Sequence, residues 1–531
     1  MTLRGRLSIL IATIFAALSA APAAVQAANS STQLTEQQRA LHVLNRLGYG
    51  PRPGDLQMVM MLGVDKYIDA ELHPETIRLP DQLIARLDTL TSQDMPIGDL
   101  LGEYLAAQKA AKNGDDDAKK KRKETFQLIA EQTDEARLAR AVYSPSQLEE
   151  VMVDFWFNHF NVFAGKGLDR ALIPSYERDA IRPYVLGHFR DLLGATARHP
   201  AMLFYLDNWQ SVAPGFEPPR RFGQPAQAKL NGLNENYARE LMELHTLGVD
   251  GGYTQHDVTE LARMLTGWTF EPQKMIKGGA VFSFVPRRHD DGDKEWLGRH
   301  ISPRGVKEGQ FALDILAAHP STAHHISYQL AQYFVNDNPP PALVERMAKR
   351  YLETDGDIRD VLRLLFSSPE FWDPKQIDSK FKTPYQYVVS AARASGLPIN
   401  NIRPLLRTLN QLGEPLYGCQ TPDGYKNTEE AWLNPDGITR RINFATVLAT
   451  GKLPLATSPN DTINTMGNAA QAPAMAAQGS GGMPASPPVD AEALLATLGG
   501  AISPKTRDTV MQSEPGLRSA LILGSPDFMR H

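Results

Sequence analysis

The residues best suited to chemistry in this chain are two histidines and two glutamates, His159, Glu240, Glu243 and His245. Glu240 and Glu243 are three residues apart in a stretch of helical periodicity, so both carboxylates can face the same side of a helix. Two carboxylates placed in this way can bind a cation or divide the roles of general acid and general base. His245 follows Glu243 by two residues, so it faces another direction and can join the carboxylates only with help from another helix.

His159 stands in a different setting, the aromatic and amide-rich stretch from Phe155 to Asn161. One ring nitrogen can be held by a neighbour there while the other is presented to a ligand. We therefore take His159 together with the two glutamates and His245 as the candidate catalytic residues.

The same helix also fits a purely structural role. Arg239 can neutralise Glu235 or Glu243, each four residues away. A buried ion-pair network that locks one helix against another gathers these residue types without any chemistry. The sequence leaves both interpretations open, and the structural network is the commoner arrangement.

Standard catalytic and cofactor motifs are missing from the chain. There is no Cys-x-x-Cys-His, no His-Glu-x-x-His, no Gly-x-Ser-x-Gly and no phosphate-binding Gly-x-x-x-x-Gly-Lys-Ser/Thr loop. The Glu-x-x-His pair of ferritin-like helices is absent from the helix with Glu240. The acidic turn at 289–293 lacks the ligand spacing of a calcium loop. The sequence therefore names no metal and no cofactor.

A polar loop forms a second candidate site. Asp423 and Asp436, each followed by glycine, flank Trp432. Asp-Gly pairs are typical of turns, and loops often carry function. We therefore consider an aromatic platform for a glycan or a peptide at Trp432.

The glutamates and His245 must be positioned by residues 233–270, which show the pattern of two amphipathic helices joined by a short turn. Gly248 has the position of a helix stop, and Thr254 and Asp257 have the spacing of a capping box. The apolar residues of the two stripes are Tyr237, Ala238, Leu241, Met242, Leu244, Val258, Leu261, Ala262 and Leu265. We expect this helix pair to form a buried hub of the fold.

Several phrases of the sequence closely resemble a bacterial family called domain of unknown function 1800. They are Glu-Asn-Tyr-Ala-Arg-Glu-Leu-Met-Glu-Leu-His-Thr-Leu-Gly from Glu235, Gly-Gly-Tyr-Thr-Gln from Gly251, Ala-Arg-Met-Leu-Thr-Gly-Trp from Ala262, Phe-Trp-Phe-Asn-His-Phe from Phe155, His-Pro-Ser-Thr-Ala from His319, Thr-Asp-Gly-Asp from Thr354, Ser-Pro-Glu-Phe-Trp from Ser368 and Asn-Pro-Asp-Gly from Asn434. The resemblance covers nearly the whole mature chain and leaves the reaction open, because the family has no established activity. It also implies a partner, since the family is often encoded beside the domain of unknown function 1501 family, which resembles an alkaline-phosphatase-type fold.

Composition sets limits on the function. The chain has 531 residues, 42% of them apolar, and a formal net charge of −5. This small acidic balance argues against a dedicated nucleic-acid binder and against strong attraction to anionic membranes. The charge run at 113–123, three aspartates followed by lysines, fits an electrostatic contact site or, more commonly, a solvated helix face or mobile link.

Residues 1–27 have the pattern of a signal peptide: Arg4 and Arg6, an apolar run, and a small-x-small site before Ala28. We expect cleavage, with an uncleaved anchor as the alternative, and no later membrane span. The single cysteine, Cys419, excludes an internal disulfide and is interpreted as a buried small residue. We expect a periplasmic or secreted protein.

The periodicity predicts a mainly α fold, one large multi-helix domain with a small β hairpin. We expect the helical family domain at 28–457, a flexible low-complexity linker at 458–490, and C-terminal helices at 491–531 that pack back on the main domain. The hairpin is expected to pair residues 280–285 with residues 295–297.

Two functions remain open from the sequence. The first is an envelope binding or assembly protein that acts with a partner. The second is an envelope hydrolase, with or without a metal, that uses His159, Glu240, Glu243 and His245. The enzyme interpretation gains if these four side chains converge on one solvent-reachable pocket, and the scaffold interpretation gains if they are sealed and paired with arginines.

Overall fold

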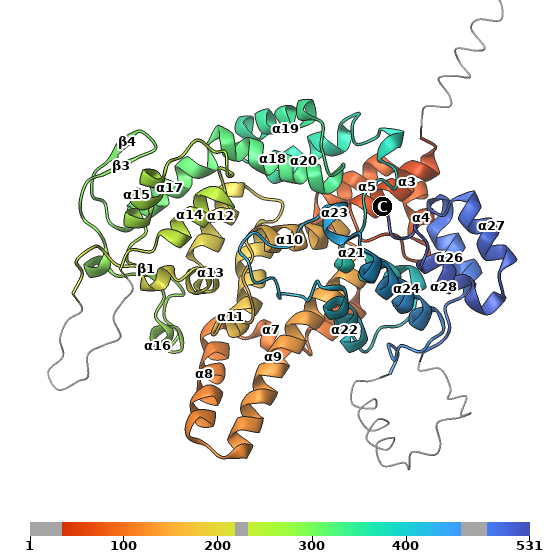
Figure 1. Ribbon diagram of the computed structural model, residues 1–531, viewed down its shortest axis with the longest axis horizontal. Helices are drawn as coiled ribbons and strands as arrows, with labels where there is room; N and C mark the ends of the chain where they lie inside the picture. Colours follow the sequence, from red (N-terminus) through yellow and green to blue (C-terminus); the bar gives the residue numbers. More distant parts are fainter. Residues whose placement is uncertain (1–33, 218–231, 458–485) are drawn as a thin grey trace, which may run out of the picture.

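The computed structural model describes residues 34–217, 232–457 and 486–531, and these residues are mainly helical, with two short pairs of antiparallel strands (Figure 1). The predicted fold class is confirmed. The expected signal peptide at 1–27 lies outside the described residues, and so does most of the segment interpreted as a linker. Across the described ranges, no helix is both long and apolar enough to cross a membrane.

The elements follow one another along the chain in three groups. The first group is α3 (Glu36–Arg46), α4 (Asp55–Leu62), α5 (Val64–Glu71), α6 (Asp81–Leu87), α7 (Thr91–Asp94), α8 (Ile97–Asn113), α9 (Asp116–Tyr143), α10 (Gln147–His159), α11 (Asp169–Ser175), α12 (Phe189–Arg198) and α13 (Pro200–Tyr205). The second is α14 (Glu235–Glu243), α15 (Gln255–Met264), β1 (Trp268–Thr269), α16 (Pro272–Met275), β2 (Ser283–Phe284), β3 (Lys294–Trp296), β4 (Arg299–Ile301) and α17 (Val306–Ala317). The third is α18 (Pro320–Phe334), α19 (Pro341–Glu353), α20 (Ile358–Ser367), α21 (Pro384–Ser395), α22 (Arg403–Leu412), α23 (Glu429–Trp432), α24 (Pro435–Ala449), α26 (Ala491–Leu498), α27 (Pro504–Gln512) and α28 (Arg518–Leu523).

The expected helix pair is present as α14 and α15. The side chain of Asn234 accepts a hydrogen bond from the backbone N–H of Tyr237 and starts α14. Thr254 and Asp257 form the predicted capping box at the start of α15. The apolar faces are fully buried through Tyr237, Ala238, Leu241, Met242, Val258, Leu261, Ala262 and Met264. The prediction that this pair lies in the core is therefore confirmed.

The strands pair differently from the expectation. β2 pairs with β1, and β3 pairs with β4, so the predicted pairing of 280–285 with 295–297 is wrong. Leu297 and Gly298 both have positive φ, 47° and 69°, as a tight two-residue hairpin turn requires, and they return the chain from β3 directly to β4. Because β3 finds its partner locally, β2 lies instead against Trp268, which is fully buried.

Helix α10 runs through the middle of the fold (Figure 1). It is buried on almost all sides, as expected for a helix enclosed by others. The indole N–H of Trp156 donates to the carbonyl of Val185 at 3.0 Å, so even its polar atom is satisfied. This burial fixes the direction in which the last turn of α10 presents Asn158 and His159.

Helices α8 and α9 form a hairpin that projects from the body (Figure 1). The side chain of Asp115 accepts a hydrogen bond from the backbone N–H of Ala118 and starts α9. The charge run at 113–123 therefore forms the tip of the hairpin and the first turns of α9 rather than a link without structure.

The last helices lie beside the body. α28 packs against α24, and α26 packs against α21. An antiparallel bridge joins Phe381 to Arg530 just before α21. The C-terminal end of the protein therefore lies beside the segment that leads into α21.

Candidate functional site

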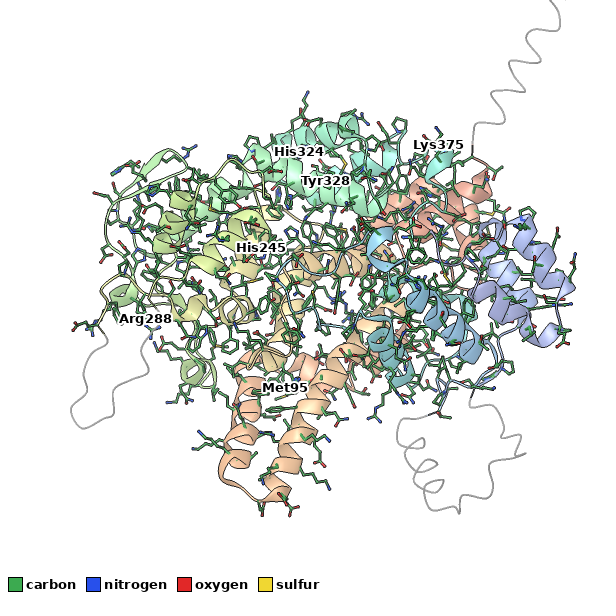
Figure 2. The ribbon with its side chains drawn as sticks, viewed as in Figure 1. Met95, His245, Arg288, His324, Tyr328 and Lys375 are labelled. Atoms are coloured by element: carbon green, nitrogen blue, oxygen red, sulfur yellow. The ribbon has the colours of Figure 1, made fainter. Side chains whose placement is uncertain are left out.

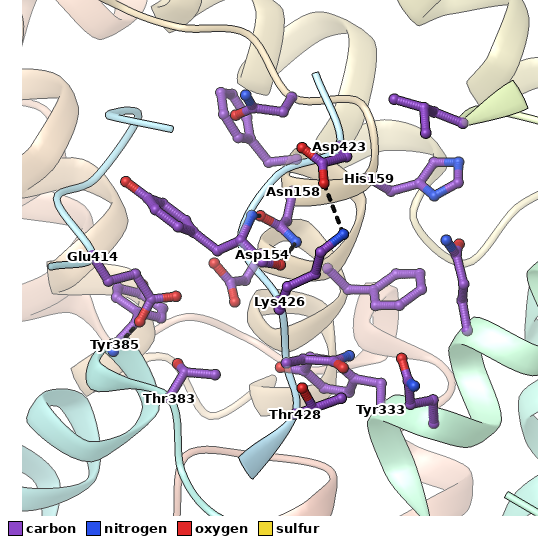
Figure 3. Close-up of a pocket in the computed structure, with 18 of the residues that line it drawn as sticks. Asp154, Asn158, His159, Tyr333, Thr383, Tyr385, Glu414, Asp423, Lys426 and Thr428 are labelled. Atoms are coloured by element: carbon purple, nitrogen blue, oxygen red, sulfur yellow. Dashed lines mark hydrogen bonds and ion pairs between the residues drawn. The ribbon is translucent and has the colours of Figure 1, made fainter. Parts of the chain in front are cut away.

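A cavity of about 420 Å³, partly open to solvent, lies where α10, the end of α14, α18, the start of α21 and the loop after α22 meet (Figure 3). Its volume falls within the range of small-molecule pockets. Aromatic rings form much of the wall, from Phe155, Phe157, Tyr333, Tyr385, Tyr417 and Tyr425. The ionisable side chains in the wall are Arg137, Asp154, His159, Glu243, His325, Glu414, Asp423 and Lys426.

Asn158, in the last turn of α10, holds the loop that closes one side of the cavity. Its amide donates to the carbonyl of Tyr425 at 2.8 Å and its amide oxygen accepts from the backbone N–H of Tyr425 at 2.7 Å. Gly424 lets the loop come this close: its φ is +67°, and an added Cβ would stand 2.3 Å from the carbonyl oxygen of Asn158. The loop is thereby fastened to the core helix by a backbone-like pair of hydrogen bonds.

Asn161 fastens the same loop a few residues earlier. Its amide nitrogen donates to the carbonyls of Cys419 and Thr421 at 3.0 and 2.8 Å. Cys419 is a buried free cysteine, which agrees with its interpretation as a packing residue. The two asparagines on either side of His159 thus position the cavity wall.

His159 and His325 line the cavity next to each other. Nε2 of His159 lies 3.2 Å from the carbonyl oxygen of His245, and Nε2 of His325 lies 3.3 Å from that of Leu244, so both rings are held by the end of α14. Burial, and then the neighbouring His325, lowers the pKa of His159 to about 3. Burial also lowers the pKa of His325. Both rings are therefore neutral near pH 7.

His245 follows the end of α14 and is not part of the cavity lining; its position is labelled in Figure 2. It is 2% exposed, and its Nε2 has no hydrogen-bond partner within the described residues. Burial holds its pKa well below the usual value. Its ring packs 5.0 Å from that of Phe160. The side chain of His245 does not reach the cavity.

Only one of the two candidate glutamates of α14 lines the cavity. Glu243 lines the cavity, where its carboxylate accepts a hydrogen bond from the hydroxyl of Tyr253 at 3.0 Å. Glu240 is half-buried outside the lining, and burial followed by the charge of Glu243 raises its pKa. Of the four candidate residues, the structure brings His159 and Glu243 to one cavity and leaves Glu240 and His245 out of it.

The expected ion pairs of Arg239 with Glu235 or Glu243 are wrong. Arg239 donates instead to the amide oxygen of Gln255 at 2.6 Å. The amide of Gln255 in turn donates to Glu235 at 2.8 Å. A neutral side chain of α15 therefore bridges the two charges, because the short turn brings the start of α15 against α14.

The structure adds a buried charge cluster that the sequence did not reveal. Arg137 of α9 donates to Oδ1 of Asp154 at 2.5 Å and to Oε2 of Glu177 at 3.1 Å. Its guanidinium lies 5.2 Å from the ring centres of both Phe157 and Tyr417. Burial alone would lower the pKa of Arg137, but Glu177 and its other neighbours hold it well above its usual value.

Asp154 of α10 faces the cavity with spare capacity to accept hydrogen bonds (Figure 3). Burial raises its pKa, and Arg137 partly offsets that rise. Arg137 is the one side-chain donor found for this carboxylate among the described residues, and it bonds to Oδ1. Oδ2 therefore remains able to accept a hydrogen bond from a molecule in the cavity.

Glu414 supplies a second carboxyl group on the other side of the wall. Its Oε2 accepts the backbone N–H of Tyr385 at 2.6 Å. Burial, followed by the charge of Asp154, raises the pKa of Glu414 to about 8, so this group holds its proton near neutral pH. Asp423 and Lys426 of the loop form an ion pair at 2.7 Å beside the same cavity (Figure 3).

The second candidate site is only partly joined to the cavity. Asp423 lines it, whereas Trp432 lies outside the lining and donates its indole N–H to the carbonyl of Lys426 at 2.6 Å. Asp436 pairs with Arg440 on α24 at 2.6 Å. Trp432 thus supports the loop from behind.

A sequence signal existed for Asp154 alone among the missed residues. It is the one charged residue in the otherwise apolar run of α10 from Val151 to Phe157. A charge in such a position requires a buried partner or a function. Arg137 and Glu414 stand in ordinary polar surroundings in the sequence, and their role arises only from the fold.

Proton transfer and hydrogen bonding are the chemistry that these side chains can supply. Within the described residues, no three His, Cys, Asp or Glu side chains are grouped so that they could hold a metal ion. A carboxyl group that holds its proton, Glu414, and one that is paired with an arginine, Asp154, form a pattern suited to general acid and base roles.

One of the comparisons with known proteins finds a family. The family described as "Protein of unknown function (DUF1800)" matches residues 42–530, which include the whole cavity lining and all four candidate residues. No curated protein and no solved structure matches the chain. Because the match covers nearly the full length, the chain belongs to the DUF1800 family of proteins of unknown function.

Proposed function

We propose that this chain is an exported binding protein of the bacterial envelope and that it holds a glycan unit in the central cavity. The observation that supports this best is the composition of the cavity wall, which combines aromatic rings with carboxylates that can accept further hydrogen bonds. Ligand sites of this kind combine apolar contact with a few polar groups that fix orientation.

The donors of the wall are largely occupied. Arg137 is held by Asp154 and Glu177, and Lys426 is held by Asp423. Acceptor capacity remains at Oδ2 of Asp154 and on the carboxylate of Glu243, since each carboxylate accepts several hydrogen bonds. A ligand that fits must therefore bring donors.

A glycan meets this requirement with its hydroxyl groups. Its ring faces also carry apolar C–H groups that can lie against the six aromatic rings. A negatively charged ligand is disfavoured, because Asp154 and Glu243 face the same cavity. A peptide offers fewer donors per unit volume and is the competing ligand class that the experiment must separate.

The export and partner parts of the proposal rest on the sequence. The charge and hydropathy pattern of residues 1–27 supports export to the periplasm or beyond. The partner of the domain of unknown function 1501 family is proposed from the resemblance alone. A pull-down of the full chain from its native envelope tests it, and recovery of no such protein would remove this part.

The binding proposal is tested with a panel of envelope glycan fragments and matched short peptides, followed by ligand-detected NMR on the purified chain. We expect signals from glycan fragments and none from peptides. Lost saturation transfer in Asp154→Asn, with Asp436→Asn unchanged as the control, supports the cavity as the site. Binding of peptides only, or equal binding by both variants, overturns the proposal.

The envelope hydrolase is the second candidate, and Glu414 favours it. Its pKa of about 8 and the neighbouring carboxyl group of Asp154, which is paired with Arg137, resemble the acid and base pair of glycoside hydrolysis. New reducing ends released from a bound glycan by the wild type, and not by Glu414→Gln, would favour the enzyme. Binding without cleavage would favour the binding protein.

A further inference from the structure

The projecting hairpin of α8 and α9 carries a groove that the central cavity does not explain. The groove holds about 920 Å³ and runs along one side of α9 toward α11. Its lining consists of Lys119, Lys120, Arg122, Lys123, Phe126, Gln127 and Ala130 of α9 and Arg170 of α11. It therefore contains five cationic side chains and no acidic one.

Most of these charges are available to a ligand. Lys119 pairs with Asp116 at 3.0 Å. Within the part of the chain that the structure describes, Lys120, Lys123 and Arg170 have no ion pair. In a chain of net charge −5, such a local concentration of positive charge creates a field that attracts anions.

One aromatic ring, that of Phe126, lines the groove and is supported from behind by a second ring. Phe126 stacks on Tyr104 of α8 with ring centres 4.1 Å apart and planes at 8°. The guanidinium of Arg122 lies 6.0 Å above the ring of Phe126. This packing ties the two arms of the hairpin together and holds Arg122 in place, unlike a lysine run that is simply solvated.

The shape of the groove favours a linear ligand over a flat surface. Positions 119 to 130 of α9 extend over roughly 16 Å at the rise of an α-helix. Ala130 and Arg170 also line a second hollow of about 320 Å³ that leads into the body. That hollow ends at Leu416 and Tyr417, which form the back of the central cavity wall.

We propose that the α9 groove is a docking site for a linear polyanion, a polymer with negative charges repeated along its chain, such as a phosphodiester polymer. The cationic side chains of the groove contact the negative charges of the polymer. The part of the groove beside Phe126 and the second hollow set the direction in which the polymer runs. An anionic membrane presents a flat array of charges that cannot follow a trough into the body. This site is independent of the ligand proposed for the central cavity.

The test uses linear polyphosphate as the probe, with binding to the full chain measured by fluorescence anisotropy at several salt concentrations. The groove variant is Lys120→Glu with Lys123→Glu. The matched control is Lys109→Glu with Lys112→Glu, which has the same spacing and charge change on exposed positions of α8 outside the groove. Circular dichroism checks that both variants fold.

We expect the wild type to bind polyphosphate with an affinity that falls as salt rises. The groove variant should bind at least about tenfold more weakly and with a shallower salt dependence, whereas the control should remain within about threefold of the wild type. Equal losses in both variants, or no binding by the wild type at low salt, overturn the proposal. Binding to phosphatidylglycerol vesicles without binding to polyphosphate also overturns it, in favour of a membrane surface.

Discussion

Two regions of the molecule bury ionisable side chains and treat them in opposite ways. Beneath β3, Lys294 and Glu308 are almost fully buried and lie 2.8 Å apart, and His289 lies 3.0 Å from the same carboxylate. Burial alone would raise the pKa of Glu308, but His289, Lys294 and backbone N–H groups lower it. In the central cavity, Asp154 and Glu414 have raised pKa values.

The two regions differ in how many hydrogen-bond donors and opposite charges surround each buried carboxyl group. Glu308 also accepts the backbone N–H groups of Arg304 and Gly305, and Lys294 donates to two carbonyls. Each charged group of that cluster therefore has a partner of opposite charge, and the cluster holds β3 and α17 together. The cavity carboxyls have fewer donors than they can accept, so buried charge by itself does not mark a site, whereas unused hydrogen-bond capacity beside a cavity does.

The largest loss of stability is expected in the buried cluster of Lys294, Glu308 and His289. Glu308→Gln removes the nearer carboxylate of the buried Lys294, leaves only Asp290 at 3.9 Å as its counter-ion, and should lower the free energy of unfolding by about 3–5 kcal/mol. The exposed pair of Arg78 and Asp81 provides the control. Asp81→Asn should change the free energy by no more than about 0.5 kcal/mol. Urea denaturation measures both, and equal losses would break the comparison.

The second largest effect is expected in the pH dependence of stability, to which Glu414 of the cavity should contribute. The pKa of Glu414 rises from 4.5 to about 8 on folding, so the folded protein binds this proton more tightly. The resulting stability is complete below pH 4.5 and is lost as pH rises toward 8, at most about 1.4 kcal/mol per pH unit. Glu414→Gln should flatten the decline between pH 5 and pH 8. Parallel pH profiles for the wild type and the variant would contradict a raised pKa at Glu414.

The loop that closes the cavity should respond to its glycine. Gly424→Ala places a Cβ against the carbonyl of Asn158 at positive φ and should destabilise the protein by about 1–3 kcal/mol. Gly516 has open space around its Cβ position and serves as the control. Thermal unfolding measures both variants. If Gly424→Ala behaves like Gly516→Ala, the loop is not fastened to α10 as described.

The smallest effect is expected on the surface of the helix pair. Arg239 donates to Gln255 in an exposed bond, so Arg239→Ala should cost no more than about 1 kcal/mol. A buried ion-pair network at this position would lose several kcal/mol. Urea denaturation beside the wild type distinguishes the two, and a large loss would restore the structural network as the role of α14.

Local patterns predicted the elements well and their distant partners poorly. The apolar stripes of 233–270 and the capping residues Thr254 and Asp257 act within a few positions of each other, so periodicity predicts them. The partner of β2 is Trp268, and nothing in the spacing of residues 280–285 indicates it. The cavity shows the same limit, since Arg137, Asp154 and Glu414 come from separate segments that only the tertiary fold joins.

Of the four candidate residues selected from the sequence, two line the cavity and two do not, and the tertiary fold again makes the difference. Glu243 and His159 reach one cavity because the end of α14 lies against the end of α10. Helical spacing placed Glu240 and Glu243 on one side, but Glu243 is the only residue of α14 in the cavity lining. His245 points into the core, which its sequence context of Leu and Thr did not reveal.

Calorimetric titration of a glycan fragment tests the central claim most directly, with the wild type, Asp154→Asn and Asp436→Asn compared in one buffer. The unused Oδ2 of Asp154 predicts one site per chain in the wild type, at least about tenfold weaker binding in Asp154→Asn, and unchanged binding in Asp436→Asn. Equal affinity in the wild type and Asp154→Asn would contradict the central cavity as the ligand site.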